Sequence, residues 1–340
     1  MSRKMKPRPP GGRKTLNLVV NIWAILSACL GIIALFWITI TVLIKGWSAL
    51  GLDFFTRMPT PPGVEGGGML NALIGTLVLT VIATVASVPL GLLGGIFLAE
   101  FGQESRVANN SRFSANVLMG MPSIIVGVFA YAVLVVTLGN FSGYAGAFAL
   151  FVIMLPVIIR TTEDMLRLVP NTLREAALAL GFPRWKVTLA IVFRAAKSGL
   201  LTGILLAIAR VSGETAPLLF TALNSPFQHF FKWNLGLNEP YPNLTVTIFD
   251  YAMSPYPDLQ VKAWGASLVI TVGILLQISI MAVSKPCMIT VWRLPRIASP
   301  PSSAPRAAAN PPTFGLTTAF LSFTLSKRLT GRYSWTGRMS

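Results

Sequence analysis

The sequence predicts an all-α integral membrane protein with six transmembrane helices. Hydrophobic residues make up 53% of the 340 residues and charged residues only 11%, whereas a soluble domain carries about 25% charged residues. The mean hydropathy is +0.66. The apolar residues also gather in largely uncharged stretches, which exceed the roughly 20 residues that a helix needs to cross a bilayer.

Five apolar stretches supply the six spans. The third is too long for one crossing and has a turn-forming run at residues 139–143, so it is predicted to hold two spans. The first follows a basic N-terminus but is too long for a signal-peptide core and lacks a cleavage site, which predicts an uncleaved span. The stretches are Leu18–Ile44, Met69–Ala99, Phe113–Ile159, Ser198–Leu223 and Ala263–Ser284.

The distribution of Lys and Arg predicts that both termini are cytoplasmic. Residues 1–14 hold six basic residues and the connection 160–197 holds six more, with Arg194 as a seventh, whereas the external candidates 45–68 and 224–262 hold two each. Basic residues concentrate in cytoplasmic loops. The formal net charge of +17 is mainly terminal and would be +3 without the basic residues of 1–14 and 285–340. No nucleic-acid partner is therefore expected.

These patterns divide the chain into four segments. Residues 1–17 are a basic cytoplasmic N-terminus, and residues 18–68 hold the first span and a periplasmic loop. Residues 69–284 form a core of five spans with a polar interruption at 170–190. Residues 285–340 form an atypical basic, Pro/Ser-rich tail, which is predicted to be disordered.

Residue types that carry catalytic chemistry are scarce. Cys29 lies within a span and Cys287 just past the last one, so both are predicted to be ordinary small apolar residues. The single histidine, His229, has no Cys or carboxylate neighbours and predicts no metal site. The chain has no Gly-Lys dipeptide and hence no phosphate-binding loop of the G-x-x-x-x-G-K-[ST] type. A membrane-embedded enzyme would need a nucleophile–base pair or metal ligands, and the sequence offers neither.

The polar interruption predicts a helix–Gly–helix element. Pro170 suits the start of a helix, with Asn171 or Thr172 as its cap. Gly181 is predicted to close that helix in a left-handed conformation, and Pro183 to start the next one.

This first helix is too short and too polar to span a membrane. Leu173, Ala177 and Leu180 are predicted to form one narrow apolar stripe. The pattern alone leaves two interpretations open: a surface presented to a partner protein, or an amphipathic connector on the membrane.

A family resemblance favours the partner surface. The run EAALALG at Glu175–Gly181 resembles the EAA motif of ABC-importer permeases, the loop that docks on a cytoplasmic ATPase. Four further segments resemble the phosphate permeases of the PstA type, and the resemblance covers roughly residues 71–283. These segments are MPSIIVGVFA (Met121–Ala130), LPVIIRTTEDMLRLVP (Leu155–Pro170), ARVSGETAPLLFTA (Ala209–Ala222) and KAWGASLVI (Lys262–Ile270).

The resemblance implies a MetI-like fold with a cytoplasmic coupling helix and a role as permease subunit of a phosphate importer in the bacterial inner membrane. The implied partners are a cytoplasmic ABC ATPase dimer that binds the ATP, a second homologous permease, an extracytoplasmic phosphate-binding protein and membrane lipid. No cofactor is expected in this chain. The residues implied to couple to the ATPase are Glu175, Ala176, Ala177, Leu180 and Gly181.

Four charged residues lie at or within predicted spans: Arg160, Glu163, Arg210 and Glu214. Charges there are costly and are candidates for function. Each Arg–Glu pair is spaced to share one helix face. It is a plain intrahelical pair, an interfacial arginine that extends to the membrane surface, or part of a path for a divalent oxyanion. Arginine suits phosphate because its planar fork donates two hydrogen bonds, and the acids would neutralise it at rest.

The chain also departs from the family pattern. Arg194 and Lys197 stand where the family usually has proline or apolar residues, and the tail after about Ser284 matches no pattern, for which a reading-frame change is one hypothesis. A permease for another oxyanion, such as sulfate or molybdate, remains an alternative, since selectivity is expected to reside in the binding protein. A membrane sensor without transport is a further alternative, against which six spans and a docking element argue.

Overall fold

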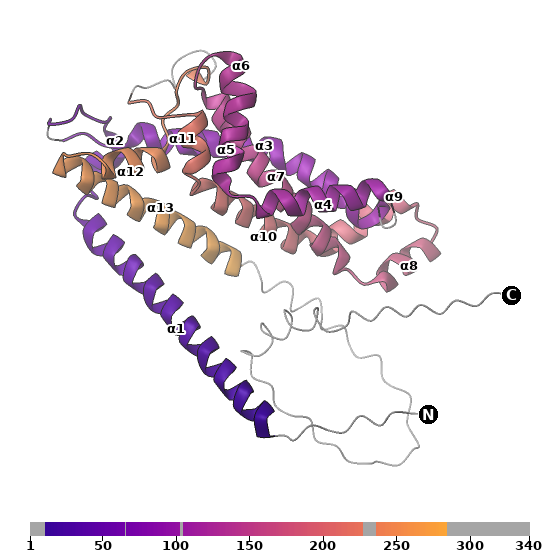
Figure 1. The fold of residues 1–340 in the computed structure, drawn as a ribbon. Helices are drawn as coiled ribbons and strands as arrows, with labels where there is room; N and C mark the ends of the chain where they lie inside the picture. Colours follow the sequence, from indigo (N-terminus) through magenta and orange to yellow (C-terminus); the bar gives the residue numbers. More distant parts are fainter. Residues whose placement is uncertain (1–10, 65, 103–104, 227–235, 284–340) are drawn as a thin grey trace. The chain divides into compact units, whose positions relative to one another are not determined.

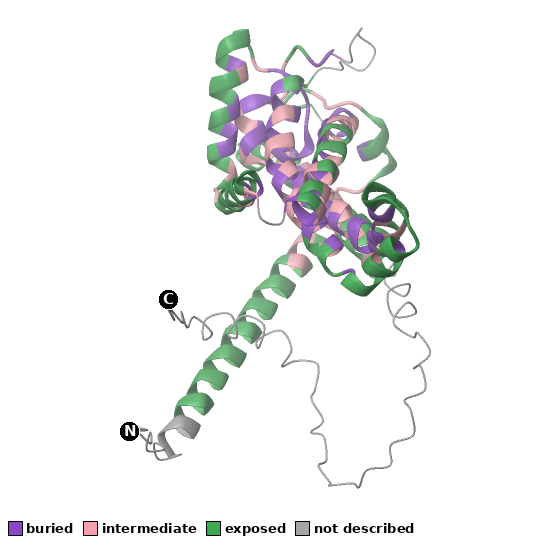
Figure 2. Cartoon of the chain, turned by 90° about the vertical axis from the view of Figure 1, so that its right-hand side faces the viewer, coloured by how far each residue is buried: buried purple, intermediate pink, exposed green. Residues whose placement is uncertain are grey.

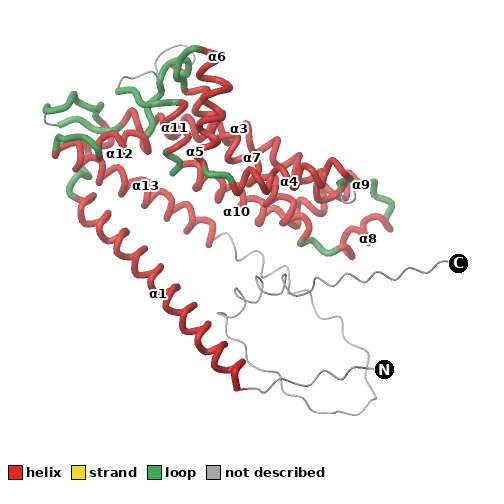
Figure 3. The backbone as a smooth tube through the Cα atoms, viewed as in Figure 1, coloured by secondary structure: helices red, strands yellow, loops and turns green. Residues whose placement is uncertain are grey.

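The computed structural model describes residues 11–64, 66–102, 105–226 and 236–283, and this part of the chain is helical with connecting loops (Figures 1 and 3). The expectations for His229, Cys287 and the tail at 285–340 lie outside the described residues. The elements are α1 (Gly11–Trp47), α2 (Leu52–Thr56), α3 (Leu70–Ile96), η1 (Phe97–Phe101), α4 (Arg106–Gly120), α5 (Ser123–Ala130), η2 (Tyr131–Val135), α6 (Val136–Leu138), α7 (Gly143–Arg167), α8 (Asn171–Ala179), α9 (Arg184–Val187), η3 (Thr188–Val192), α10 (Phe193–Ser212), α11 (Ala216–Thr221), α12 (Leu244–Ala252) and α13 (Pro257–Val283).

Five helices of the described residues are long and apolar enough to cross a membrane, and a bent pair brings the number to six if it counts as one span. This agrees with the predicted fold class. The five are Leu16–Trp47, Leu70–Phe101, Gly143–Arg167, Arg184–Ser212 and Pro257–Ile280.

The third span differs from the prediction. Residues 106–120 and Ser123–Leu138 are two helices that meet at an angle of 105°, so Phe113–Ile159 does not hold two straight spans. Pro122 has no N–H group and cannot continue α4, and it holds Met121 in an extended conformation. The turn predicted at 139–143 is confirmed, because Gly139 has a φ of 76° and the Ser142 hydroxyl caps α7.

The fifth span also has other bounds than Ser198–Leu223. The helix runs without a break from Arg184 to Ser212 and ends at Gly213, and α11 is a separate short helix. Arg194 and Lys197 therefore lie inside a continuous helix. The predicted start at Ser198 follows the last charged residue, Lys197, and is wrong. A helix continues as long as its backbone hydrogen bonds do, whatever the polarity of its side chains.

Glycines let α7 pack closely between two neighbours. An added Cβ at Gly95 of α3 would lie 2.4 Å from Thr162 Cβ of α7, and one at Gly203 of α10 would lie 2.9 Å from Thr161 Oγ1. Small residues at such positions allow membrane helices to approach each other. The central apolar cluster forms around these contacts and includes Leu79, Leu150, Met154, Ile158 and Ala207.

Helix α1 is buried only near its end. It packs there against α13, where a Cβ at Gly46 would lie 2.7 Å from the Trp264 carbonyl oxygen. Residues 16–38 of the helix are exposed, as Figure 2 shows. Exposed apolar side chains over more than 20 residues are typical of a helix that meets lipid.

Candidate functional site

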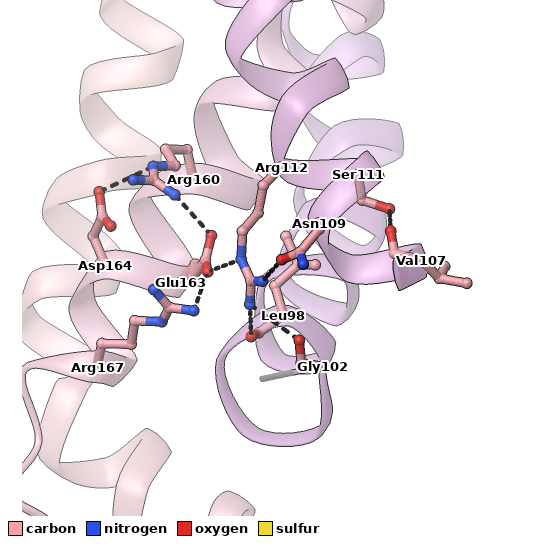
Figure 4. Close-up of polar contacts among 10 residues, drawn as sticks. All are labelled: Leu98, Gly102, Val107, Asn109, Ser111, Arg112, Arg160, Glu163, Asp164 and Arg167. Atoms are coloured by element: carbon pink, nitrogen blue, oxygen red, sulfur yellow. Dashed lines mark hydrogen bonds and ion pairs between the residues drawn. The ribbon is translucent and has the colours of Figure 1, made fainter. Parts of the chain in front are cut away.

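Glu163 is a buried carboxylate surrounded by three arginines (Figure 4). Its Oε1 lies 2.6 Å from Arg112 Nε and 2.8 Å from Arg167 Nη2, and its Oε2 lies 3.0 Å from Arg160 Nη1. We call these four residues the Glu163 cluster. Asp164 adds a second carboxylate, 3.5 Å from Arg160 Nε, so three guanidinium groups face two acids.

Helix periodicity positions most of this cluster. Helix α7 continues past the predicted end of its span to Arg167, so Arg160 and Arg167 lie three and four residues from Glu163 on one face. Arg112 comes from α4 and crosses to α7. Its remaining donors bind Asn109 Oδ1 at 2.9 Å and the carbonyl oxygens of Leu98 at 2.7 Å and Gly102 at 3.3 Å (Figure 4).

Exposure separates the roles of the three arginines. The Arg112 side chain is 14% exposed and Glu163 is 0% exposed, so their pair is shielded from water and from salt. Arg160 and Arg167 are 33% and 45% exposed, so each presents part of its guanidinium outward. The cluster can hold α4 against α7 and still offer hydrogen-bond donors to an anion.

Arg210 and Glu214 form a second, separate pair. Arg210 Nε lies 3.6 Å from Glu214 Oε1, but Glu214 lies beyond the end of α10, in the turn after Gly213. The expectation that both share one helix face is therefore wrong. In the described residues no ion pair or hydrogen bond joins this pair to the Glu163 cluster.

The register between α10 and α7 gives the depth of Arg210. Gly199 lies against Met165 and Gly203 against Thr161, so the two helices run antiparallel. Arg210 follows Gly203 by seven residues, about 10 Å along the helix, which places it level with the middle of α7. Its side chain is 45% exposed at that depth. A half-exposed charge level with the middle of α7 is costly in lipid and marks a water-filled or protein-covered face.

The C-terminal end of α8, the first helix of the helix–Gly–helix element, forms as predicted. Gly181 has a φ of 81°, its N–H donates to the Leu178 carbonyl at 2.9 Å, and the N–H of Phe182 donates to the Ala177 carbonyl at 3.3 Å. This is the Schellman pattern. At the N-terminal end of α8, Pro170 precedes the helix as predicted. Neither Asn171 nor Thr172 caps the helix with its side chain. Asn171 Oδ1 instead accepts from Arg174 Nη1.

The apolar stripe of α8 is not the predicted one. Ala177 is 3% exposed and packs into a core with Leu166, Val187 and Val192. Leu180 is 78% exposed, so the two residues do not share a buried face. Glu175, Ala176 and Gly181 are exposed, as are Leu173 and Trp185. The outward surface of α8 and α9 therefore carries a carboxylate, alanine, large apolar side chains and the basic residues Arg184 and Lys186, while Ala177 packs into the interior of the chain.

Sequence reasoning missed the partners that come from elsewhere in the chain. Arg112 lies 51 residues from Glu163, in a connection whose near-neutral charge gave no orientation signal. Arg174 on α8 pairs with Glu100 at the end of α3 and η1, with Nη2 2.8 Å from Oε1. In the sequence, these pairs are indicated only by an arginine and a glutamate that lie next to apolar runs. Few other charged residues are available there as partners.

The sequence is similar to a family of known membrane proteins. Residues 91–289 match a family model described as "Binding-protein-dependent transport system inner membrane component". The chain is 48% identical over 263 residues to the phosphate transport system permease protein PstA of Haemophilus influenzae, covering 77% of this chain and 91% of that protein. The protein of that name from Yersinia pestis is 46% identical over 78% of this chain and 88% of its own length.

More distant proteins also match over most of the chain. PstA 1 of Mycobacterium tuberculosis is 36% identical over 76% of this chain and 85% of that protein. Among solved structures, a chain of a bacterial alginate ABC transporter has a TM-score of 0.50 and 11% identity, covering 84% of this chain and 99% of that one. This last likeness concerns the fold alone.

Proposed function

This chain belongs to the family of binding-protein-dependent transport system inner membrane components, and from that membership we propose that it forms half of the translocation path of an ATP-driven importer for inorganic phosphate. The observation that carries the proposal is the similarity to phosphate transport permeases, which reaches 48% identity over 91% of the relative's length. The substrate follows from those relatives, and the geometry of the arginines supports it.

The Arg210–Glu214 pair supports a path for an oxyanion at the middle of the membrane. Arg210 is half exposed there and its ion pair is long, at 3.6 Å. A guanidinium held loosely by one carboxylate can exchange that partner for a phosphate oxygen, because both accept the same planar pair of donors. Glu214 then keeps the resting path from trapping the anion.

The Glu163 cluster supports a second station toward the end of α7. The guanidinium groups of Arg160 and Arg167 are each partly exposed. The guanidinium of Arg112 instead makes structural hydrogen bonds to two backbone carbonyl oxygens and one side-chain amide oxygen. In this proposal Arg160 and Glu163 line the path, and Arg112 fixes the carboxylate that neutralises it.

Energy enters through α8. The chain has no phosphate-binding loop of the nucleoside-triphosphatase type, so we assign ATP binding and hydrolysis to a separate cytoplasmic ATPase dimer and no cofactor to this chain. The exposed residues Glu175, Ala176, Leu180 and Gly181 form the docking surface, on which Glu175 offers a carboxylate to a basic group of the ATPase. Both termini are then cytoplasmic, as the basic N-terminal residues favour.

The remaining partners complete the importer. A second, homologous permease subunit covers the face that exposes Arg210, and an extracytoplasmic binding protein delivers phosphate to the pair. The half-exposed Arg210 supports such a cover, since a charge at that depth does not face lipid without cost.

Growth of a phosphate-uptake-deficient strain tests the function. The gene, expressed with its ATPase, second permease and binding protein, should restore growth at limiting phosphate, and an Arg210→Gln variant should not. Failure in this strain, together with restored growth of a sulfate- or molybdate-uptake-deficient strain when that oxyanion is limiting, would assign another oxyanion to the same architecture.

A further inference from the structure

Arg174 joins the helix α8 to the ends of two other helices. Its Nη2 donates to Glu100 Oε1 at 2.8 Å, and its Nε lies 3.2 Å and 3.4 Å from the two oxygens of that carboxylate. The other donors reach back to the end of α7, with Nη1 2.5 Å from the Val169 carbonyl oxygen and Nη2 2.8 Å from that of Leu166.

This contact is largely shielded from solvent. The side chains of Arg174 and Glu100 are 18% and 12% exposed, and Ala99 and Ala177 are buried in the same apolar core beside them. An ion pair with two parallel hydrogen bonds fixes orientation as well as distance. At low exposure it is also little weakened by salt.

The backbone on either side of α8 provides no comparable link. The helix is preceded by Pro170, whose ψ of 141° is extended, and followed by Gly181 with a φ of 81°. Both residues are points where chain direction changes. A force on α8 carried by the backbone alone would turn the helix about these two points before it displaced a span.

We propose that Arg174 and Glu100 form a strut that transmits displacement of α8 to α3 through η1, so that α8 and the ends of α3 and α7 move as one body. The inference rests on the proposed function, because it takes α8 as the element that the partner ATPase moves. Arg174 and Glu100 are then positioning residues, because they touch neither ATP nor phosphate. They determine how much of the displacement of α8 in each ATPase cycle is transmitted to the membrane spans.

The main test compares Glu100→Gln with a matched control in the reconstituted full complex. Glutamine keeps the size of the side chain and removes its charge. The control Asn171→Ala removes a neighbouring acceptor of the same arginine, 3.1 Å from Nη1, and leaves the link to Glu100 intact. The readout is phosphate imported per ATP hydrolysed, together with the amount of ATPase that co-purifies.

We expect Glu100→Gln to retain the ATPase and its hydrolysis while import per ATP falls at least about fivefold, the lower end of ordinary allosteric coupling. Glu100→Asp, which keeps the charge, should recover part of the loss, and Asn171→Ala should stay near the wild-type ratio. Import per ATP at the wild-type level in Glu100→Gln would overturn the strut. Loss of the ATPase from the complex would also overturn it, because the pair would then act in assembly.

A distance measurement tests the strut without transport. Spin labels at the exposed positions Phe101 and Ala179, in a background with Cys29 and Cys287 replaced by serine, report the separation of η1 and α8. The separation should be the same in nucleotide-free and ATP-trapped complexes, and it should differ between them in Glu100→Gln. A wild-type separation that changes with nucleotide would refute the strut, even if the imported ion proved not to be phosphate.

Discussion

Replacing Glu163 by glutamine removes the buried carboxylate that three arginines share, and the structure predicts the size of the loss. Arg112 is 14% exposed and its Nε lies 2.6 Å from Glu163 Oε1. Removing one partner of a buried pair costs about 3–5 kcal/mol, since the other charge is left uncompensated. The more exposed Arg160 and Arg167 each add only about 0–1 kcal/mol. Arg112 therefore dominates, and the total should be about 3–7 kcal/mol.

Thermal unfolding of the purified complex in detergent measures this loss. At roughly 2–4 °C for each kcal/mol, the unfolding midpoint of Glu163→Gln should lie roughly 10 °C below the wild type. The double variant Arg112→Gln/Glu163→Gln should be more stable than Glu163→Gln alone, because it also removes the orphaned cation. A midpoint for Glu163→Gln within about 2 °C of the wild type would show that Glu163 does not compensate the charge of Arg112, as would strict additivity of the two changes.

Four further variants follow from the same structure. Arg210→Gln should lower phosphate uptake roughly tenfold or more with assembly unchanged, because a hydrogen bond to a charged group contributes about 1.5–3 kcal/mol; normal uptake would exclude Arg210 from the path. Gly181→Pro should leave ATP hydrolysis without uptake, because proline cannot adopt the φ of 81° and has no N–H for the Leu178 carbonyl; coupled uptake would argue against the Schellman end. Ala177→Trp should lower the unfolding midpoint through overpacking of about 1–3 kcal/mol, and an unchanged midpoint would place Ala177 at the outer surface. Gly95→Leu should separate α3 from α7 and lower the yield of folded protein, whereas an expression level equal to wild type would contradict the close contact with Thr162.

Local signals were sufficient for much of the fold. Uncharged stretches identify most spans, because the cost of burying charge in lipid applies residue by residue. Gly139 and Gly181 mark two helix ends, because a positive φ favours glycine whatever surrounds it. These features depend on a few neighbouring residues, so a single sequence contains them.

The direction in which a helix runs and the burial of a side chain depend on the rest of the chain, and both were missed at Met121–Pro122 and at Ala177. Met121–Pro122 lies inside an uncharged run. Hydropathy does not indicate that the helices on either side of it meet at an angle of 105°. Ala177 fits either a docking surface or a packed interior, because alanine is small and mildly apolar, and only the approach of Val187 and Val192 decides for the interior.

The charged site shows the same division. The spacing of Arg160, Glu163 and Arg167 on one helix can be read from the sequence. That Arg112 closes the Glu163 cluster requires α4 to fold back against α7 across 51 residues. The pairing of Arg174 with Glu100 spans 74 residues. No periodicity reports such contacts, and their chemistry becomes visible only when helices are packed.

Uptake of radiolabelled phosphate by proteoliposomes measures whether this chain is part of an ATP-driven phosphate importer. The vesicles contain this chain with its second permease and ATPase, and the binding protein is added outside with ATP supplied to the ATPase. We expect phosphate accumulation that requires both ATP and the binding protein, and that excess sulfate or molybdate does not reduce. Accumulation that proceeds without ATP, or that occurs for sulfate or molybdate and not for phosphate, would contradict this expectation.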